Sequence, residues 1–331
     1  MGDVLAALGM EIPIVLAPMG LAAGPELVAA VSNSGGLGMI PLWRIDPSML
    51  AEQIRAVRSM TSRPFGVNLN LIWPQDERLA ACIDEGIDIV HFFWGDPSAL
   101  AGKAHAGGLT VMQTVGSAAE ARRAVDGGAD IVVAQGFEAG GHVWGQVSTI
   151  VLVPAVVDAV GSTPVFAAGG IADGRGLAAV LALGAAAGWI GTRFLASPEA
   201  NVHQHYRDKL VAAGEADTYL GTVFDIGWPP DAPGRTLRNK TVVGWEEAGQ
   251  PPQGSRPGEG EVVASSPATG NILRYQATLP ARNATGDLDA MAMWAGQSVG
   301  LIHRVQPAAD IVAEIWAEAQ ATIVKLKAGL R

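Results

Sequence analysis

Cysteine is almost absent from this chain of 331 residues, since Cys82 is the only one. A single cysteine excludes an internal disulfide and every metal site that needs several cysteine ligands. Cys82 falls at an apolar position of an expected helix, so we interpret it as a small buried hydrophobic residue. His203 and His205 lie two residues apart on another expected helix, where their side chains point roughly 200° apart and cannot share a metal ion. We therefore predict no metal site.

Positive charge is scarce as well. The chain has 22 basic and 32 acidic residues, a net charge of −10, and no cluster of lysine and arginine. This balance argues against nucleic acid and anionic membranes as partners. Residues 1–4 lack the basic and apolar segments of a signal peptide, and the uncharged stretch 176–192 is too short and too rich in glycine for a membrane span. We expect a cytoplasmic protein, and the sequence leaves open whether it forms a homodimer.

The composition is otherwise that of an enzyme with a large buried core. Hydrophobic residues make up 49% of the chain and charged residues 16%. Short apolar runs alternate with alanine-rich segments of helical pattern. The apolar runs are continuous, which is typical of strands buried on both faces in a parallel sheet. The expected strands are 14–17, 37–40, 65–68, 89–92, 110–114, 131–134, 165–168 and 188–191.

Eight strand–helix units in order favour a (β/α)8 TIM barrel, an α/β fold. A weak internal repeat supports it, because near Gly86, Gly128 and Gly184 a helix ends at a glycine and the chain enters the next buried strand. A doubly wound parallel sheet would produce the same local pattern and is the alternative. The count of eight favours the barrel.

The pattern breaks after the eighth unit, whose last helix is expected over 199–213. We assign residues 1–214 to the barrel and 215–290, which are rich in Gly, Pro, Ser and Thr, to an irregular second lobe inserted near the C-terminus. This lobe is expected to cover the barrel mouth as a lid; the alternative is a surface insertion without a catalytic part. Residues 291–331 are expected to form C-terminal helices that pack back on the barrel, one over 291–302 and an amphipathic one over 308–326.

Three consecutive strand ends carry small and polar residues. One leads into a glycine-rich loop with a single histidine, His142, and the next two lead into Gly169-Gly170 and Gly191-Thr192. In a barrel, the last two loops and a helix N-terminus form the usual phosphate site. There is no P-loop lysine motif and no G-x-G-x-x-G after the first strand. We therefore expect a phosphorylated flavin or a sugar phosphate, with His142 as the acid/base candidate because imidazole titrates near neutral pH.

Motifs at several strand ends match those of one known family. They are Ala17-Pro18-Met19, Gly66-Val67-Asn68, the run from Ala134 to His142, the run from Ala168 to Gly176, Gly191-Thr192-Arg193-Phe194 and Ala295-Gly296-Gln297. Together they resemble the nitronate monooxygenase (2-nitropropane dioxygenase) family of FMN-dependent barrels. The resemblance spans nearly the whole chain and is strongest from 131 to 195. Flavin-dependent enoyl-acyl-carrier-protein reductases and NADH:quinone reductases share much of this framework. The motifs are therefore specific for the superfamily and much less specific for the reaction.

The resemblance implies FMN as cofactor and assigns residues to it. Met19 would lie against the isoalloxazine ring, and Asn68 would hydrogen-bond that ring. His142 would be the catalytic base. The other residues implied in cofactor binding are Gln113, Gln135 and Gly140, together with Gly169, Gly170, Gly191 and Thr192 around the phosphate.

Tryptophans are numerous, nine against three tyrosines. Five of them fall near strand ends or next to the motifs above, and we expect them to line the substrate pocket: Trp43, Trp73, Trp94, Trp144 and Trp294. The alternative is that these indoles fill space between the barrel and the lobe. An aromatic wall would exclude water and favour a bulky or apolar substrate.

The resemblance implies oxidation of alkyl nitronates or nitroalkanes by dioxygen to a carbonyl compound and nitrite. His142 would remove a carbon-bound proton from the small-molecule substrate, and FMN would carry the electrons. The first alternative is an NAD(P)H-dependent flavin reductase that acts on a quinone or an enoyl thioester. The second is a flavin-binding protein without turnover.

Overall fold

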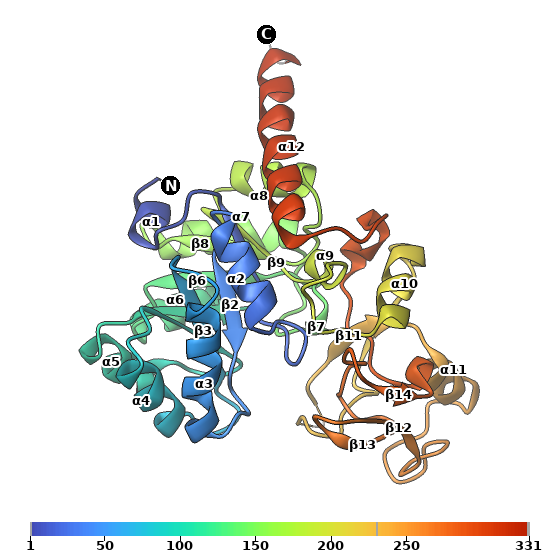
Figure 1. Ribbon diagram of the computed structural model, residues 1–331. Coiled ribbons are helices and arrows are strands. Elements are labelled where there is room, and N and C mark those ends of the chain that lie inside the picture. Colours follow the sequence, from blue (N-terminus) through green and yellow to red (C-terminus); the bar gives the residue numbers. More distant parts are fainter. Residues whose placement is uncertain (1, 230, 330–331) are drawn as a thin grey trace.

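Eight parallel strands form a nearly closed barrel in the computed structural model, which describes residues 2–229 and 231–329 (Figure 1). The strands are hydrogen-bonded in the order β1-β9-β8-β6-β5-β4-β3-β2, and a bridge between Val15 and Leu37 joins the two ends. The fold is therefore the predicted TIM barrel, and all eight expected strands are present. They are β1 (Ile14–Leu16), β2 (Gly38–Pro41), β3 (Phe65–Asn70), β4 (Ile89–Phe93), β5 (Thr110–Val115), β6 (Ile131–Gln135), β8 (Val165–Ala168) and β9 (Ala187–Ile190).

Helices connect the strands and cover the outside of the barrel. In sequence order they are α1 (Gly2–Ala7), α2 (Pro25–Asn33), α3 (Pro47–Arg58), α4 (Asp76–Asp84), α5 (Ser98–Ala106), α6 (Ala118–Asp126), α7 (Thr149–Val160), α8 (Gly174–Ala182), α9 (Thr192–Leu195) and α10 (Gln204–Ala212). The helix expected over 199–213 begins later, because His203 caps it by accepting a hydrogen bond at Nδ1 from the His205 N–H at 3.0 Å. Cys82 on α4 is fully buried, as predicted, and burial raises the pKa of its thiol to about 12.

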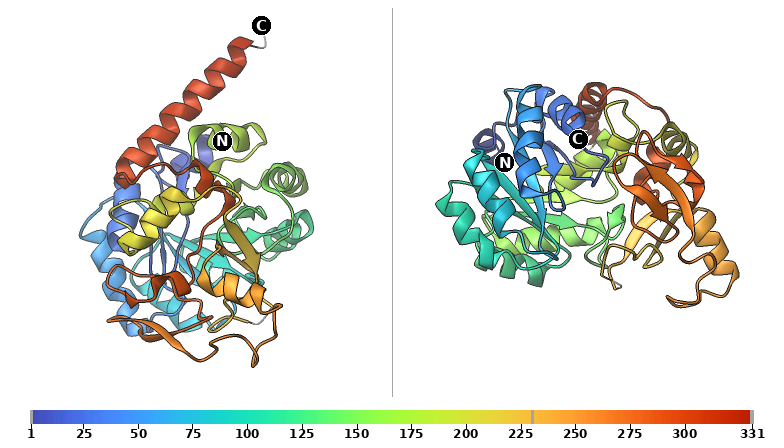
Figure 2. Two further views of the ribbon diagram at one scale, coloured as in Figure 1. Left: turned by 90° about the vertical axis from the view of Figure 1, so that its right-hand side faces the viewer. Right: turned by 60° about the horizontal axis from the view of Figure 1, so that its bottom comes forward.

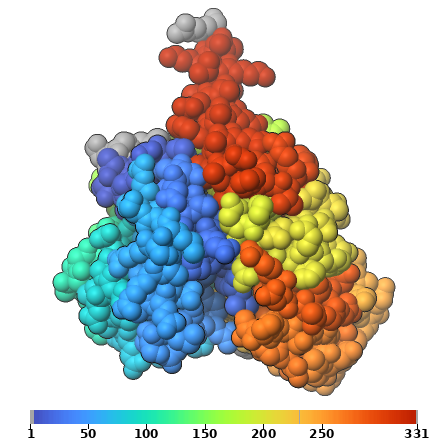
Figure 3. Space-filling view, in the orientation of Figure 1, coloured from blue at the N-terminus to red at the C-terminus, as the bar shows by residue number. Residues whose placement is uncertain are grey.

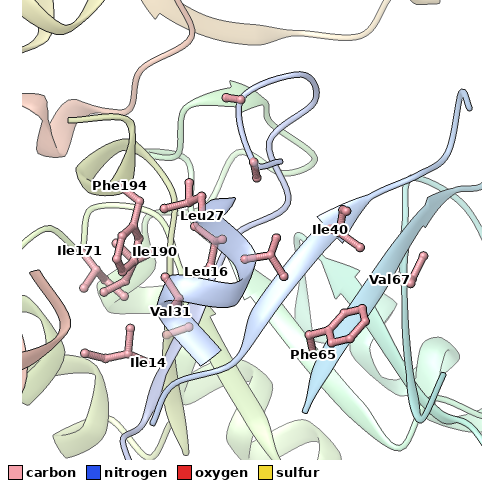
Figure 4. Packing of buried hydrophobic residues seen from close by; sticks show 14 of the residues in the cluster. Ile14, Leu16, Leu27, Val31, Ile40, Phe65, Val67, Ile171, Ile190 and Phe194 are labelled. Carbon is pink, nitrogen blue, oxygen red and sulfur yellow. The ribbon is translucent and has the colours of Figure 1, made fainter. Parts of the chain in front are cut away.

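Hydrophobic side chains fill both faces of the sheet. Met39 and Phe166 belong to the cluster inside the barrel. On the outer face, Leu16 of β1 packs with Leu27 and Val31 of α2 (Figure 4). Because each strand is buried on both sides, its sequence is a continuous apolar run and lacks the alternation of a half-exposed strand.

The lobe after α10 contains two small antiparallel sheets (yellow to red in Figure 1) and one helix. It is therefore more regular than the sequence indicates, and the boundaries at 214 and 290 stay a prediction. β7 belongs to the barrel loop after β6, so its pairing with β11 ties the lobe to the barrel. The elements are β7 (Gly141–His142), β10 (Thr218–Gly221), β11 (Gly234–Leu237), α11 (Lys240–Glu247), β12 (Val262–Ser266), β13 (Gly270–Leu273) and β14 (Thr285–Gly286).

The segment that follows is not the helix expected over 291–302. Residues 291–296 run extended beside β11, where the Leu237 N–H donates to the Met293 carbonyl at 2.7 Å and the Ala295 N–H donates to the Arg235 carbonyl at 3.2 Å. Short 3-10 helices lie on either side, η1 (Leu288–Ala290) and η2 (Gln297–Leu301). The apolar residues here are buried by the lobe and the barrel together, so their pattern carries no helical period.

The closing helix α12 (Ala308–Gly329) forms as predicted and packs on α8 and α2. Its buried residues end at Ala319, and beyond this point it projects from the body of the protein (Figure 2). Ile323 and Leu326, expected to pack on the barrel, are 43% and 57% exposed. Of the helices in residues 2–329 that the structure describes, none has the length and apolar character to cross a lipid bilayer.

Candidate active site

The carboxyl ends of the barrel strands border a cavity of about 1070 Å³ between the barrel and the lobe. Figure 3 shows the surface hollowed where the blue barrel residues meet the orange residues of the lobe. All but one of the predicted catalytic and cofactor residues line this cavity: Met19, Asn68, Gln135, Gly140, His142, Gly169, Gly170, Gly191 and Thr192. The barrel therefore brings together residues that are far apart in the sequence.

Gln113 is the predicted cofactor residue that does not line the cavity. Its Nε2 donates hydrogen bonds to the Gly95 and Thr114 carbonyls, both at 3.0 Å. Successive side chains of a strand point to opposite faces, and on β5 it is Thr114 that lines the cavity. Gln113 therefore anchors the loop after β4 from below the lining.

His142 is held from both sides of the cavity. Gln135, the last residue of β6, donates from Nε2 to the His142 carbonyl at 3.1 Å and accepts at Oε1 from the Trp144 N–H at 2.8 Å. On the other side, β7 pairs with β11 through His142 and Gly234. The barrel and the lobe together therefore fix the backbone that carries the imidazole.

The His142 imidazole is neutral at neutral pH. Burial lowers its pKa to about 3, which the nearby carbonyls of Ala232 and Pro233 offset only in part. Both ring nitrogens are buried, and neither forms a hydrogen bond within the described part of the chain. One nitrogen of a neutral imidazole carries a free lone pair, which is the form that a general base requires, but a pKa of about 3 makes His142 a weaker base than the near-neutral imidazole expected from the sequence.

Three indoles enclose the imidazole of His142. Trp228 stacks on it with ring centroids 3.5 Å apart and an interplanar angle of 27°. The Trp294 ring is tilted, with its centroid 5.0 Å from that of His142, and the Trp94 ring is nearly perpendicular to His142, with the centroids 5.9 Å apart. Trp228 comes from the lobe and was not among the expected pocket residues, because nothing in its proline-rich sequence context distinguishes it from a surface tryptophan.

The other predicted tryptophans join the same aromatic cluster. Trp43 and Trp73 stack at 5.0 Å, and both present edges to Trp228. Trp144 contacts Trp94 at 4.9 Å. Of the five expected pocket residues, Trp43 and Trp294 line the main cavity, whereas Trp73 lines a smaller neighbouring cavity of about 640 Å³. Trp94 and Trp144 line neither, so they stand behind the cavity wall.

The loops after β8 and β9 offer free hydrogen-bond donors. The main-chain N–H groups of Gly169, Gly170 and Thr192 have no acceptor among the described residues. Gly169 and Gly170 have φ of +96° and +75°, the left-handed region that favours glycine. A Cβ on Gly169 would also lie only 2.9 Å from the Gly136 carbonyl oxygen. These loops therefore suit a phosphate group, which binds unhindered N–H groups.

The Ala295-Gly296-Gln297 motif joins these loops to the His142 loop. The Gly296 N–H donates to Thr192 Oγ1 at 3.0 Å, and the Gln297 N–H donates to the Glu138 carbonyl at 3.0 Å. A Cβ on Gly140 would lie 2.4 Å from the Gly296 nitrogen, so two backbones touch here. This close approach explains the glycines at both positions.

Asn68 contacts a second buried histidine. Its Nδ2 donates to His91 Nδ1 at 3.0 Å, which leaves the His91 proton on Nε2, where it is donated to Thr114 Oγ1 at 2.7 Å. Burial lowers the pKa of His91 to about 3, and its ring lies against Trp189 at 4.7 Å. Asn68 Oδ1 accepts no hydrogen bond from the described residues and is free for a ligand. His91 also lines the cavity.

Comparison with known proteins identifies the family. The family model described as nitronate monooxygenase matches residues 3–77 and 70–318, which is nearly the whole chain. This chain belongs to the nitronate monooxygenase family. The resemblance noted in the sequence is thereby confirmed, and the protein is an oxidoreductase enzyme. Within residues 2–329 as described, no group of three or more His, Cys, Asp or Glu side chains is placed to hold a metal ion.

Curated relatives of this family member carry two kinds of name. A probable nitronate monooxygenase of Staphylococcus aureus (strain Newman) is 32% identical, over 93% of this chain and 94% of the relative. The (3aS,4S,5R,7aS)-5-hydroxy-7a-methyl-1-oxo-octahydro-1H-indene-4-carboxyl-CoA dehydrogenase of Rhodococcus jostii (strain RHA1) is 38% identical, over 73% of this chain and 67% of the relative. The names point to more than one reaction within this group.

Similar solved structures also carry more than one kind of name. FabK from Thermotoga maritima is 34% identical with a TM-score of 0.81, covering 98% of both chains. Nitroalkane oxidase from Streptomyces ansochromogenes is 28% identical with a TM-score of 0.80, covering 97% of this chain and 99% of that one. The nitronate monooxygenase fold of this chain therefore extends over its full described length, lobe included.

Proposed function

We propose that the protein binds FMN and oxidises alkyl nitronates or nitroalkanes with dioxygen to a carbonyl compound and nitrite. The observation that carries the proposal is the neutral, unpartnered imidazole of His142 beside a cavity that also presents free N–H donors. A general base and a phosphate site in one cavity suit a flavin enzyme that removes a proton from carbon. The similarity to a probable nitronate monooxygenase of Staphylococcus aureus and to nitroalkane oxidase of Streptomyces ansochromogenes supports this choice of substrate.

The residues present fit FMN. The N–H groups of Gly169, Gly170 and Thr192 would hold its phosphate, and Asn68 Oδ1 would accept a hydrogen bond from the ring. Met19 lies beside this site, since a Cβ on Gly191 would be 3.5 Å from its Sδ. When bound, FMN accepts electrons from the substrate and passes them to dioxygen.

His142 supplies the proton chemistry. A ring nitrogen would accept the proton from the carbon next to the nitro group, and the imidazolium formed would then stand beside an anionic nitronate. The opposite charges stabilise each other strongly where indoles exclude water. A nitronate supplied as the anion needs no proton removal, so its turnover depends on His142 less.

A second candidate is a dehydrogenase or reductase that acts on a large thioester with a nicotinamide partner. Its support is the 38% identity to a dehydrogenase named for a carboxyl-CoA compound and the 34% identity to FabK. The cavity of about 1070 Å³ has room beyond a flavin for a substrate of some size.

Oxygen uptake and nitrite release distinguish the candidates. With added nitronate and no nicotinamide nucleotide, we expect oxygen consumption and nitrite. Oxidation of NADH or NADPH that depends on a quinone or an enoyl thioester, with no nitrite from nitronate, would favour the second candidate.

A further inference from the structure

We propose that Trp228 is a movable gate residue that controls access of the substrate to His142. The proposal rests on the proposed function only in taking His142 as the base. His142 borders the cavity, yet neither of its ring nitrogens is accessible or hydrogen-bonded among the described residues. No substrate can reach a nitrogen in this arrangement, so at least one of the groups that cover the ring has to move.

Trp294 is poorly suited to move. Its Nε1 donates to the Ala277 carbonyl at 3.4 Å, and its own carbonyl accepts a hydrogen bond from the buried Tyr206 hydroxyl. Its ring also packs against Phe224, 6.0 Å between centroids, within a buried cluster of the lobe. Moving this indole would break a partly buried hydrogen bond and open the core of the lobe.

Trp94 is held from the barrel side. It has φ of +62°, a conformation that costs energy for a residue with a side chain and that persists only where surrounding contacts enforce it. The next residue, Gly95, is fixed by the hydrogen bond from Gln113 Nε2 to its carbonyl. Trp94 also meets His142 only with an edge, so it covers less of the ring than Trp228 does.

Trp228 has the fewest restraints of the three. It lies between β10 and β11 on a loop, where its N–H donates to the Asp225 carbonyl at 3.0 Å in a local turn. Its Nε1 forms no hydrogen bond with the described residues. The preceding Gly227 is exposed, has φ of +94°, and contacts the barrel through a long 3.5 Å hydrogen bond from Arg44. A glycine in this position allows the backbone rotation that would withdraw the indole.

In the position seen here, which we call closed, the Trp228 indole lies in an aromatic slot formed by three tryptophans of the barrel. Trp43, Trp73 and Trp94 all make T-shaped contacts with the Trp228 indole, with ring centroids 5.4, 5.5 and 5.9 Å apart. When Trp228 withdraws, the face of His142 and this aromatic slot become available together. A flat or apolar substrate would then enter the space that the indole leaves, with its acidic carbon at the edge of the His142 ring, because the lone pair of a ring nitrogen lies in the ring plane.

Chemical labelling of the histidines tests the gate without any turnover. Diethyl pyrocarbonate acylates neutral imidazole nitrogens, and peptide mass spectrometry gives the rate at each histidine of the flavin-loaded enzyme. His303 is exposed and serves as the internal reference. In Trp228→Ala, we expect the rate at His142 relative to His303 to rise at least tenfold, and in Trp228→Phe to rise less.

Trp245→Ala is the matched control. Trp245 also belongs to the lobe, but its Nε1 donates to the Pro251 carbonyl and its ring packs on Tyr219, with no contact to His142. The ratio should be unchanged in this variant. A ratio within twofold of the unmodified protein in both folded Trp228 variants, as judged by circular dichroism, would overturn the gate. Since no substrate is used, this outcome is separate from a failure of the proposed reaction.

Discussion

Gln135 bridges the main chain on both sides of the His142 side chain, donating to the His142 carbonyl at 3.1 Å and accepting from the Trp144 N–H at 2.8 Å. Gln135→Ala removes both bonds, which together contribute about 1 to 3 kcal/mol. We expect kcat to fall roughly tenfold or more, because the imidazole is no longer held in place. Steady-state kinetics at saturating nitroalkane measures this.

Gln75→Ala is the matched control for that substitution. Like the half-buried Gln135, Gln75 makes two hydrogen bonds to main-chain groups, in its case from Nε2 to the Trp43 and Asn70 carbonyls, but its loop does not touch His142. We expect kcat to change less than twofold. Equal losses in the two variants would mean that Gln135 acts through general stability.

Replacing His142 should lower the turnover of a neutral nitroalkane much more than the turnover of a nitronate. His142→Asn keeps a polar side chain of similar reach but cannot accept the proton, so turnover of neutral nitroalkane should fall by about 10²–10⁴. Preformed nitronate should lose far less, because its proton has already left. Bound flavin should remain, as shown by its absorbance. Small, equal effects on both substrates would argue against His142 as the base.

Gly170→Ala tests the phosphate loop. A Cβ here meets only Glu138 at 3.7 Å, so space is available, but φ of +75° strains alanine by about 1–2 kcal/mol. Relaxing that strain turns the N–H away, and the Kd for FMN should rise roughly tenfold in a fluorescence titration. Gly176→Ala, inside α8 with its nearest contact at 3.5 Å, should bind FMN unchanged. Identical affinities in the two variants would count against this phosphate site.

The two buried histidines should make the fold sensitive to acid. Burial lowers the pKa of His91 and of His142 to about 3, whereas both titrate near 6.5 in the unfolded chain. Between these values the unfolded chain binds more protons, so stability falls as the pH drops from 6.5 towards 3. Between pH 6 and pH 5 each histidine contributes up to about 1.4 kcal/mol per pH unit. Denaturant unfolding at fixed FMN measures the free energy of unfolding at each pH. In His142→Asn, the slope of this free energy against pH should be smaller by nearly one proton. A slope identical to that of the unmodified protein would contradict this.

The barrel was predictable because its signals are local. Each strand is a continuous apolar run, and glycines such as Gly86, Gly128 and Gly184 mark helix ends with positive φ. The lobe was less predictable because its pairing is long-range. Gly141 lies opposite Arg235 in β7 and β11, and no pattern in either segment indicates the other. The prediction of a helix over 291–302 was wrong for the same reason, since long-range contacts with β11 hold its first part extended.

In the site, too, local signals were predictable from the sequence and long-range contacts were not. Gly169, Gly170, Gly191 and Thr192 line one cavity, as expected for small residues at strand ends that converge on one rim of a barrel, and their role toward a phosphate stays a prediction. Gln113 does not line the cavity, because successive side chains of β5 point in opposite directions and it is Thr114 that faces the cavity. Trp228 reaches His142 from a loop more than 80 residues later in the sequence, and only the folded lobe brings the two rings together.

Anaerobic reduction of the bound flavin tests the central claim most directly. The purified enzyme, free of oxygen, is mixed with an alkyl nitronate in one cuvette and with NADH or NADPH in another, and the flavin absorbance near 450 nm is followed. We expect bleaching by the nitronate, without nicotinamide, and return of the colour with nitrite release when air is admitted. Bleaching by NADH or NADPH alone, with the nitronate leaving the flavin oxidised, would contradict it.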